Sequence, residues 1–299
     1  MKQQIKSSLI LLLTATIWGV AFVAQSVGME YIGPFTFNAI RCVLGGLVLI
    51  PVILVLKKKK ETGAENQEKE DKKTLWAGGI ACGVILCIAS NLQQFGIMEA
   101  SVGKSGFFTA LYIVMIPVIG IFIGKRPGIK LWFCVALAVV GMYLLCMKDG
   151  SFTIERADIM LLLCALAFSF HILVVDYFSP RVDGVKMSCI QFFVCGVLSA
   201  VGMLFTETPD ISNIQAAWLP LLYAGLLSCG VGYTLQIVGQ KGINPVIASL
   251  IMSLESVISA LAGWVILGQV LSPKEILGCI LTDSYTHLRA HETAANLVC

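Results

Sequence analysis

The chain has 299 residues, of which 57% are hydrophobic and only 13% are charged, and its net charge is +3. A soluble domain carries roughly 25% charged residues, so the composition excludes an ordinary soluble protein and predicts a membrane protein. The small net charge gives no reason to expect a nucleic-acid partner. The 11 cysteines lack the paired spacing of a zinc or redox site, so we interpret them as packing residues and expect no disulfide, metal or cofactor.

Apolar runs long enough to cross a bilayer follow one another along the chain, since a membrane span needs about 20 mostly apolar residues. Nine runs qualify, at residues 8–25, 35–56, 75–97, 106–123, 130–147, 158–177, 187–205, 216–239 and 246–267. A tenth run begins near Lys274 and stops after Leu281. Residues 282–299 are too polar to complete this span, so we expect a truncated tenth helix followed by a tail that is not native.

One connecting segment, residues 57–73, is long and charged, with the sequence KKKKETGAENQEKEDKK. We interpret it as a solvated linker. Lysine and arginine concentrate in this linker and in the other segments that share its side of the membrane with the N-terminus. Because basic residues stay on the cytoplasmic side, we predict a cytoplasmic N-terminus. The alternative, a cleaved leader ending near Ala24, would leave the first half with four spans and destroy its match to the second half.

Short stretches of the first half return in the second half. Ala110–Tyr112 corresponds to Ser253–Glu255, and Ile40–Arg41 corresponds to Ile190–Gln191. With an odd number of spans in each half, the two halves have opposite orientations in the membrane. Such an inverted repeat encloses one central cavity and is typical of secondary transporters.

Three ionisable side chains lie inside the apolar runs. Placing such a group in the membrane is energetically unfavourable, so each is a candidate for a functional role. Glu255 falls near the bilayer midplane, where it either meets a substrate or proton or makes a hydrogen bond between helices. Arg41 either attracts an anionic group of a substrate or extends to the interface as an anchor. His171 either relays protons or packs as a hydrogen-bonded residue.

Uncharged polar side chains inside the runs of both halves predict the wall of a binding cavity, because Tyr and Trp bind by stacking and by one polar tip. The candidates are Trp18, Asn91, Tyr112, Tyr233 and Gln236. Gly103-Lys104-Ser105 looks like the end of a phosphate-binding loop, but Met98 stands where that motif needs glycine. No nucleophile triad is apparent, so we do not expect an enzyme.

The segment Leu254–Gln269 resembles the signature helix of EamA-type transporters, in the drug/metabolite transporter superfamily. Ile17–Phe22 resembles the first helix of that family, and Arg41 resembles the arginine of its second helix. Ser256 departs from the pattern, which often has proline there. The resemblance implies an all-α integral membrane fold of ten helices in two inverted five-helix EamA repeats, here residues 7–147 and 157–281.

The resemblance and the repeat together suggest a secondary carrier in a bacterial-type plasma (inner) membrane. It would export a small polar metabolite, such as an amino acid, by alternating access, with Glu255 and Arg41 as the charged site groups. Proton coupling through Glu255 or His171 is a further hypothesis. The alternatives are an importer or exchanger of a nucleotide sugar or other metabolite, and a receptor or scaffold that does not transport. The expected partners are a small molecule and the lipid bilayer, and the sequence does not indicate an oligomeric state.

Overall fold

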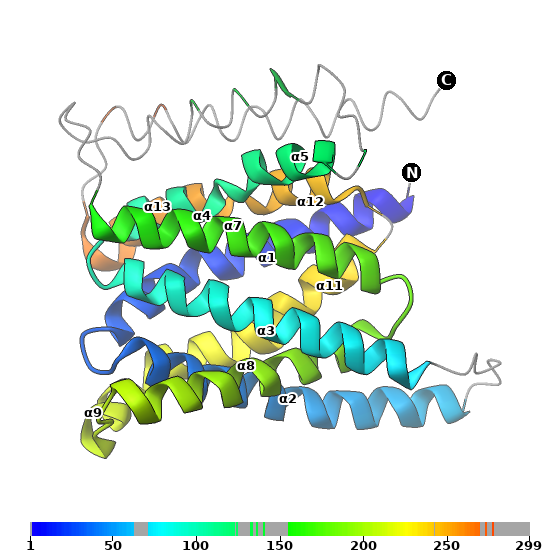
Figure 1. Ribbon diagram of the computed structural model, residues 1–299, viewed down its shortest axis with the longest axis horizontal. Helices are drawn as coiled ribbons and strands as arrows, with labels where there is room; N and C mark the ends of the chain where they lie inside the picture. The colour runs from blue at the N-terminus through cyan, green and yellow to red at the C-terminus, as the bar shows by residue number, and fades with distance from the viewer. Residues whose placement is uncertain are drawn as a thin grey trace.

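A computed structural model shows long helices that run side by side in one bundle (Figure 1). It describes residues 2–62, 71–122, 155–241 and 243–269, together with positions 124, 132, 133, 136, 140, 273 and 277. Within these residues the secondary structure is helical, without strands. The predicted fifth span, the truncated tenth span and the tail at 282–299 lie outside the described residues.

The first half contributes α1 (Lys2–Gly28), α2 (Pro34–Thr62), α3 (Lys72–Ile97), α4 (Val102–Ala110) and α5 (Tyr112–Phe122). The second half contributes α7 (Arg156–Phe178), α8 (Gly184–Thr206), α9 (Ile211–Ala216), α10 (Trp218–Leu222), the π-helix η1 (Tyr223–Tyr233), α11 (Thr234–Gln240), α12 (Pro245–Met252) and α13 (Glu255–Leu267). Among the described residues, 8 helical stretches are long and apolar enough to span a membrane. They coincide with the first four predicted runs and with the sixth to ninth, so the protein is an integral membrane protein, and the count of ten stays a prediction.

The helix boundaries of the two halves correspond. The turn from Gly28 to Pro34 has the same length as the turn from Phe178 to Gly184. Three later boundaries recur 143 positions further on, at Ile97 and Gln240, Val102 and Pro245, and Tyr112 and Glu255. We call two residues matched when they occupy corresponding positions in this alignment. In Figure 1, α1 leads away from the end of the bundle that carries the N-terminus, whereas α7 leads toward it, so the two-repeat architecture with opposite orientations fits the structure.

The packing of the helices follows the same correspondence. Helix α3 packs on α7 and α8, and its counterparts η1 and α11 pack on α1 and α2. Helix α1 packs on α12 and α13, and its counterpart α7 packs on α4 and α5. Helix α2 packs along α8, and these two helices are counterparts of each other. Each contact between two helices therefore has an equivalent between their counterparts in the other half. This symmetry places an approximate two-fold axis through the centre of the bundle.

Two spans are interrupted at matched positions. The fourth span breaks at Leu111, between α4 and α5, and the ninth breaks at Ser253 and Leu254, between α12 and α13. The third span departs from this symmetry, because α3 is one continuous helix whereas its counterpart contains the π-helix η1. Discontinuous helices bring backbone ends and their side chains to the middle of the membrane, where transporters place their sites.

The free backbone N–H groups at the N-termini of α2 and α8 find hydrogen-bond acceptors in different ways. Asp183 caps its own helix, since its carboxylate accepts hydrogen bonds from the backbone N–H groups of Val185 and Lys186. The matched position before α2 is Gly33. Glu207, which follows α8, supplies the missing cap, and its two oxygens accept from the N–H groups of Phe35 at 2.8 Å and Thr36 at 2.9 Å. One repeat therefore caps a helix of the other.

Asp71 precedes the third span and caps the start of α3. The Thr74 hydroxyl and the Lys73 backbone N–H donate hydrogen bonds to its carboxylate, and they lower the pKa of Asp71. Residues 57–62 belong to α2 and residues 72 and 73 belong to α3, so both ends of the segment predicted as a linker at 57–73 are helical.

Candidate functional site

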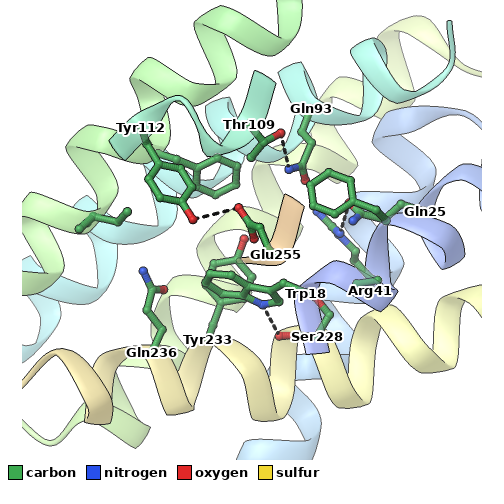
Figure 2. A pocket seen from close by; sticks show the side chains of 14 residues that line it. Trp18, Gln25, Arg41, Gln93, Thr109, Tyr112, Ser228, Tyr233, Gln236 and Glu255 are labelled. Atoms are coloured by element: carbon green, nitrogen blue, oxygen red, sulfur yellow. Dashed lines mark hydrogen bonds between the residues drawn. The ribbon is translucent and has the colours of Figure 1, made fainter. Parts of the chain in front are cut away.

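A cavity lies in the centre of the bundle and is lined by both halves of the chain (Figure 2). Its volume is about 30 Å³, far below the roughly 300–1,000 Å³ of pockets that hold small-molecule ligands. The lining residues are Trp18, Ala21, Phe22, Gln25, Arg41, Gln93, Thr109, Tyr112, Phe168, Ile172, Ser228, Tyr233, Gln236 and Glu255. In this conformation the cavity therefore has room for only a few water molecules.

Matched residues line the cavity from opposite sides. Four matched pairs contribute, namely Trp18 with Phe168, Phe22 with Ile172, Gln93 with Gln236, and Tyr112 with Glu255. A cavity formed by the same positions of both repeats must lie on the approximate two-fold axis. This is where a carrier with inverted repeats holds its substrate.

Tyr112 and Glu255 are the first residues of α5 and α13, directly after the two helix breaks. The Tyr112 hydroxyl donates a hydrogen bond to Glu255 Oε1 at 3.0 Å. Both side chains are buried, with exposed fractions of 2% and 3%. The pair joins the two repeats across the axis, and it presents a carboxyl group to the cavity.

Arg41 lies on α2 and is only 2% exposed. Its Nη1 donates to Gln25 Oε1 at 2.8 Å, and its guanidinium carbon lies 5.6 Å from the centroid of the Phe37 ring. Its Nε has no hydrogen-bond partner among the described residues. The side chain therefore lies in the interior and does not extend to the interface.

Arg41 and Glu255 both line the cavity without pairing with each other. Within the described part of the chain, the ion pairs join Lys104 to Glu155 at 3.0 Å and to Asp158 at 2.8 Å, and neither Arg41 nor Glu255 takes part in one. In Figure 2, Gln25 and Arg41 lie on one side of the cavity, and Tyr112 and Gln236 lie on the other. The cavity thus has one cationic side and a carboxyl group apart from it.

Aromatic rings form another part of the wall. The rings of Trp18 and Tyr233 lie 4.6 Å apart at an angle of 54°. Trp18 Nε1 donates to the backbone oxygen of Ser228 in η1 at 3.4 Å. A Cβ atom at Gly232 would lie 2.7 Å from Trp18 Nε1, so glycine is required for this close approach. The π-helix therefore fits directly against the aromatic wall.

The sequence-predicted residues Trp18, Arg41, Tyr112, Tyr233, Gln236 and Glu255 all meet at this cavity, but Asn91 and His171 do not line it. Asn91 accepts a hydrogen bond from Asn38 at 2.9 Å and donates to Ser199 Oγ at 3.0 Å, so it joins α2, α3 and α8. His171 Nε2 lies 3.1 Å from Gln191 Oε1. The contact joins α7 to α8, and both interpretations of His171, as a packing residue and as a proton relay, stay predictions.

Sequence reasoning missed four lining residues with polar groups, namely Gln25, Gln93, Thr109 and Ser228. Gln93 could have been found, because Leu92-Gln93 is matched by Leu235-Gln236 in the alignment that pairs Tyr112 with Glu255. Thr109 and Ser228 offer no such signal, since single hydroxyl residues are common in membrane helices.

Other groups that could carry chemistry lie away from the cavity or lack the arrangement for it. Gly103-Lys104-Ser105 is in the first turn of α4, and Lys104 makes the two ion pairs given above. The cysteines of the described residues are free thiols. Those residues also contain no group of three or more His, Cys, Asp or Glu side chains placed to hold a metal ion.

Comparison with known proteins agrees with this architecture. The sequence model of the EamA-like transporter family matches residues 5–147 and again residues 155–282. An uncharacterized transporter of Archaeoglobus fulgidus is 27% identical, over 91% of this chain and 81% of the relative. The uncharacterized transporter YwfM of Bacillus subtilis is 24% identical, over 92% of this chain and 90% of the relative.

A solved crystal structure shows the same fold, with a TM-score of 0.75, 18% sequence identity and coverage of 98% of both chains. The resemblance that the sequence suggested is confirmed. The family match covers both halves of the chain, and the protein therefore belongs to the EamA-like transporter family.

Proposed function

We propose that this membrane transporter is a secondary-active carrier that exports a small polar metabolite, such as an amino acid, by alternating access. The observation that carries the proposal is the unpaired cation and carboxyl group in one cavity on the axis between the repeats. We further propose that the carrier lies in a bacterial-type plasma membrane with its N-terminus in the cytoplasm.

A zwitterionic solute fits the charges of this cavity. Burying a charged group without a partner is unfavourable, and a bound counter-charge removes that cost. The carboxylate of an amino acid would meet Arg41, and its ammonium group would meet Glu255. Trp18 and Tyr233 would contact the side chain of the solute. Tyr112 and Gln236 would add polar contacts, and Asn91 would act indirectly by holding α2, α3 and α8 together.

The small volume of the cavity supports alternating access. A volume of about 30 Å³ is too small for an amino acid, so the repeats must separate on one side of the membrane to admit it. In the absence of solute, Glu255 could hold a proton in place of the ammonium group, which would couple transport to protons. A nucleotide sugar would require several basic groups for its phosphates, and of the lining residues Arg41 alone is basic.

The proposal is tested by the extracellular metabolite profile of cells that express the protein. Cells that express Glu255→Gln provide the comparison, and Glu99→Gln is the matched control, because Glu99 is exposed and lies outside the cavity. We expect one class of amino acid to accumulate outside cells with the unchanged protein and with Glu99→Gln, and not with Glu255→Gln. Identical profiles, with all three proteins present in the membrane, would contradict export; faster uptake by the expressing cells would then favour an importer.

A further inference from the structure

The glutamines Gln93 and Gln236 are matched residues that line the same cavity, yet their side chains are satisfied differently. Gln93 Nε2 donates to Thr109 Oγ1 at 3.3 Å. The residue matched to Thr109 is Met252, which has no oxygen to offer. Gln236 Oε1 is buried and has no hydrogen-bond partner among the described residues, and the side chain is 1% exposed.

An unpaired buried carbonyl oxygen is unfavourable unless a ligand or water supplies a donor. The side chain of Gln236 extends from α11 toward the cavity, on the side where Tyr112 lies, and Gln25 and Arg41 are on the far side (Figure 2). Glu255 Oε1 is occupied by the Tyr112 hydroxyl. The acceptors of this part of the wall are therefore an amide oxygen and a carboxyl group that Tyr112 holds in place.

We propose that Gln236 Oε1 and the Glu255 carboxylate together bind a primary ammonium group, so that Gln236 selects solutes with a primary amine over their N-methylated analogues. The inference rests on the proposed function and adds the group that determines its selectivity. A primary ammonium group has three N–H donors and serves both acceptors at once, whereas a trimethylated nitrogen has none. A site built to accept hydrogen bonds rejects an analogue that lacks the donors, because its buried acceptors stay unpaired.

A glutamine with a purely structural role would behave differently. Gln93 provides the matched control, because it lines the same cavity at the corresponding position and its amide is held by Thr109. If burial or packing alone mattered, Gln93→Leu and Gln236→Leu would have the same effect on selectivity. If Gln236 supplies an acceptor, only its replacement by a residue without an oxygen changes selectivity, and Gln236→Glu preserves it.

The experiment measures binding to the purified full chain in detergent, by the shift in its thermal unfolding temperature. The probes are the common L-α-amino acids and the N,N,N-trimethyl derivative of each that binds. We expect the unchanged protein to prefer the primary form. Gln236→Leu should bind that form about tenfold more weakly and lose the preference, Gln93→Leu should keep the ratio of the two affinities, and Gln236→Glu should keep the preference.

The outcomes separate the two proposals. If no amino acid binds the unchanged protein, the proposed function fails. If an amino acid binds and Gln236→Leu discriminates as the unchanged protein does, the role of Gln236 is overturned while the proposed function stands. If Gln236→Leu does not fold, Gln236→Glu decides, because the loss of discrimination in a variant that keeps its acceptors would also overturn the inference.

Discussion

The Tyr112 hydroxyl and the Glu255 carboxyl occupy matched positions, and they bond to each other. Duplication of the repeat explains why two polar residues meet on the axis at the starts of α5 and α13. Divergence explains why one is a donor and the other an acceptor. Two carboxylates at these positions would repel each other, whereas the present pair fixes the orientation of the one carboxyl group.

Replacing Tyr112 by Phe should reduce transport, because the Glu255 carboxyl loses the group that orients it. The free energy of unfolding should fall by about 1 kcal/mol, the usual effect of losing one buried hydrogen bond. Transport into proteoliposomes and thermal unfolding in detergent measure the two effects. Tyr223→Phe is the control, since Tyr223 donates to the backbone oxygen of Ile17 at 3.1 Å and does not line the cavity. Equal transport by the two variants would show that the Tyr112 hydroxyl does not position Glu255.

At the scale of the helices, the cap of α2 illustrates how the two repeats depend on each other. Gly33 leaves room for Glu207, since a Cβ atom at Gly33 would lie 2.3 Å from the Glu207 carboxyl carbon. The carboxylate also favours the N-terminus of α2 through the helix dipole. The loop before α2 therefore has no capping side chain of its own, and the cap comes from a residue more than a hundred positions away.

Glu207→Ala should lower the free energy of unfolding by about 1 kcal/mol, because α2 loses its cap. In that background Gly33→Asp should restore stability, since the vacated space lets α2 carry its own aspartate as α8 does. In the unchanged protein the same Gly33→Asp should destabilise, because the new side chain would collide with Glu207. Denaturant or thermal unfolding of the unchanged protein, the two single variants and the double variant measures the effect of Gly33→Asp on stability in each background. Destabilisation by Gly33→Asp in both backgrounds would contradict the prediction.

At the scale of the whole molecule, the two ends of the bundle differ in charge. The N-terminus, the end of α2 and the starts of α3 and α8 lie at one end (Figure 1). That end carries Lys57, Lys72, Arg181, Lys186 and Lys241, and the other carries Glu30, Glu99, Glu155, Glu207 and Asp210. Because basic residues stay in the cytoplasm, we expect the basic end to face it.

Trypsin provides the test of this orientation, since it cleaves after lysine and the linker at 57–73 contains a run of lysines. We expect cleavage between the second and third spans in inside-out membrane vesicles and protection in right-side-out vesicles. Protein released into detergent should be cleaved from either preparation, which controls for the activity of the protease. Cleavage in right-side-out vesicles alone would reverse the orientation.

Hydrophobicity predicted the spans well, because the need to bury apolar length in a membrane overrides local propensity. It could not predict the breaks at Leu111 and Leu254, since neither position carries a helix-breaking residue and tertiary packing decides them. Glu255 and Arg41 were found because charged residues inside spans are rare. Gln93 lines the cavity and Asn91 does not, although they lie two positions apart on one helix. The sequence could not distinguish them, because only packing decides which of the two faces the cavity.

The π-helix η1 and the continuous helix α3 occupy corresponding places in the two repeats. Were the repeats identical, exchanging their conformations would interconvert an inward-open and an outward-open state of equal free energy. Under the proposed mechanism the unequal third spans would remove that equality, because one state would keep η1 against Trp18 and the other would repack it. If the protein works by the proposed alternating access, we expect the unloaded carrier to have a preferred resting side, set by the backbone of one segment before any solute or proton gradient acts on it.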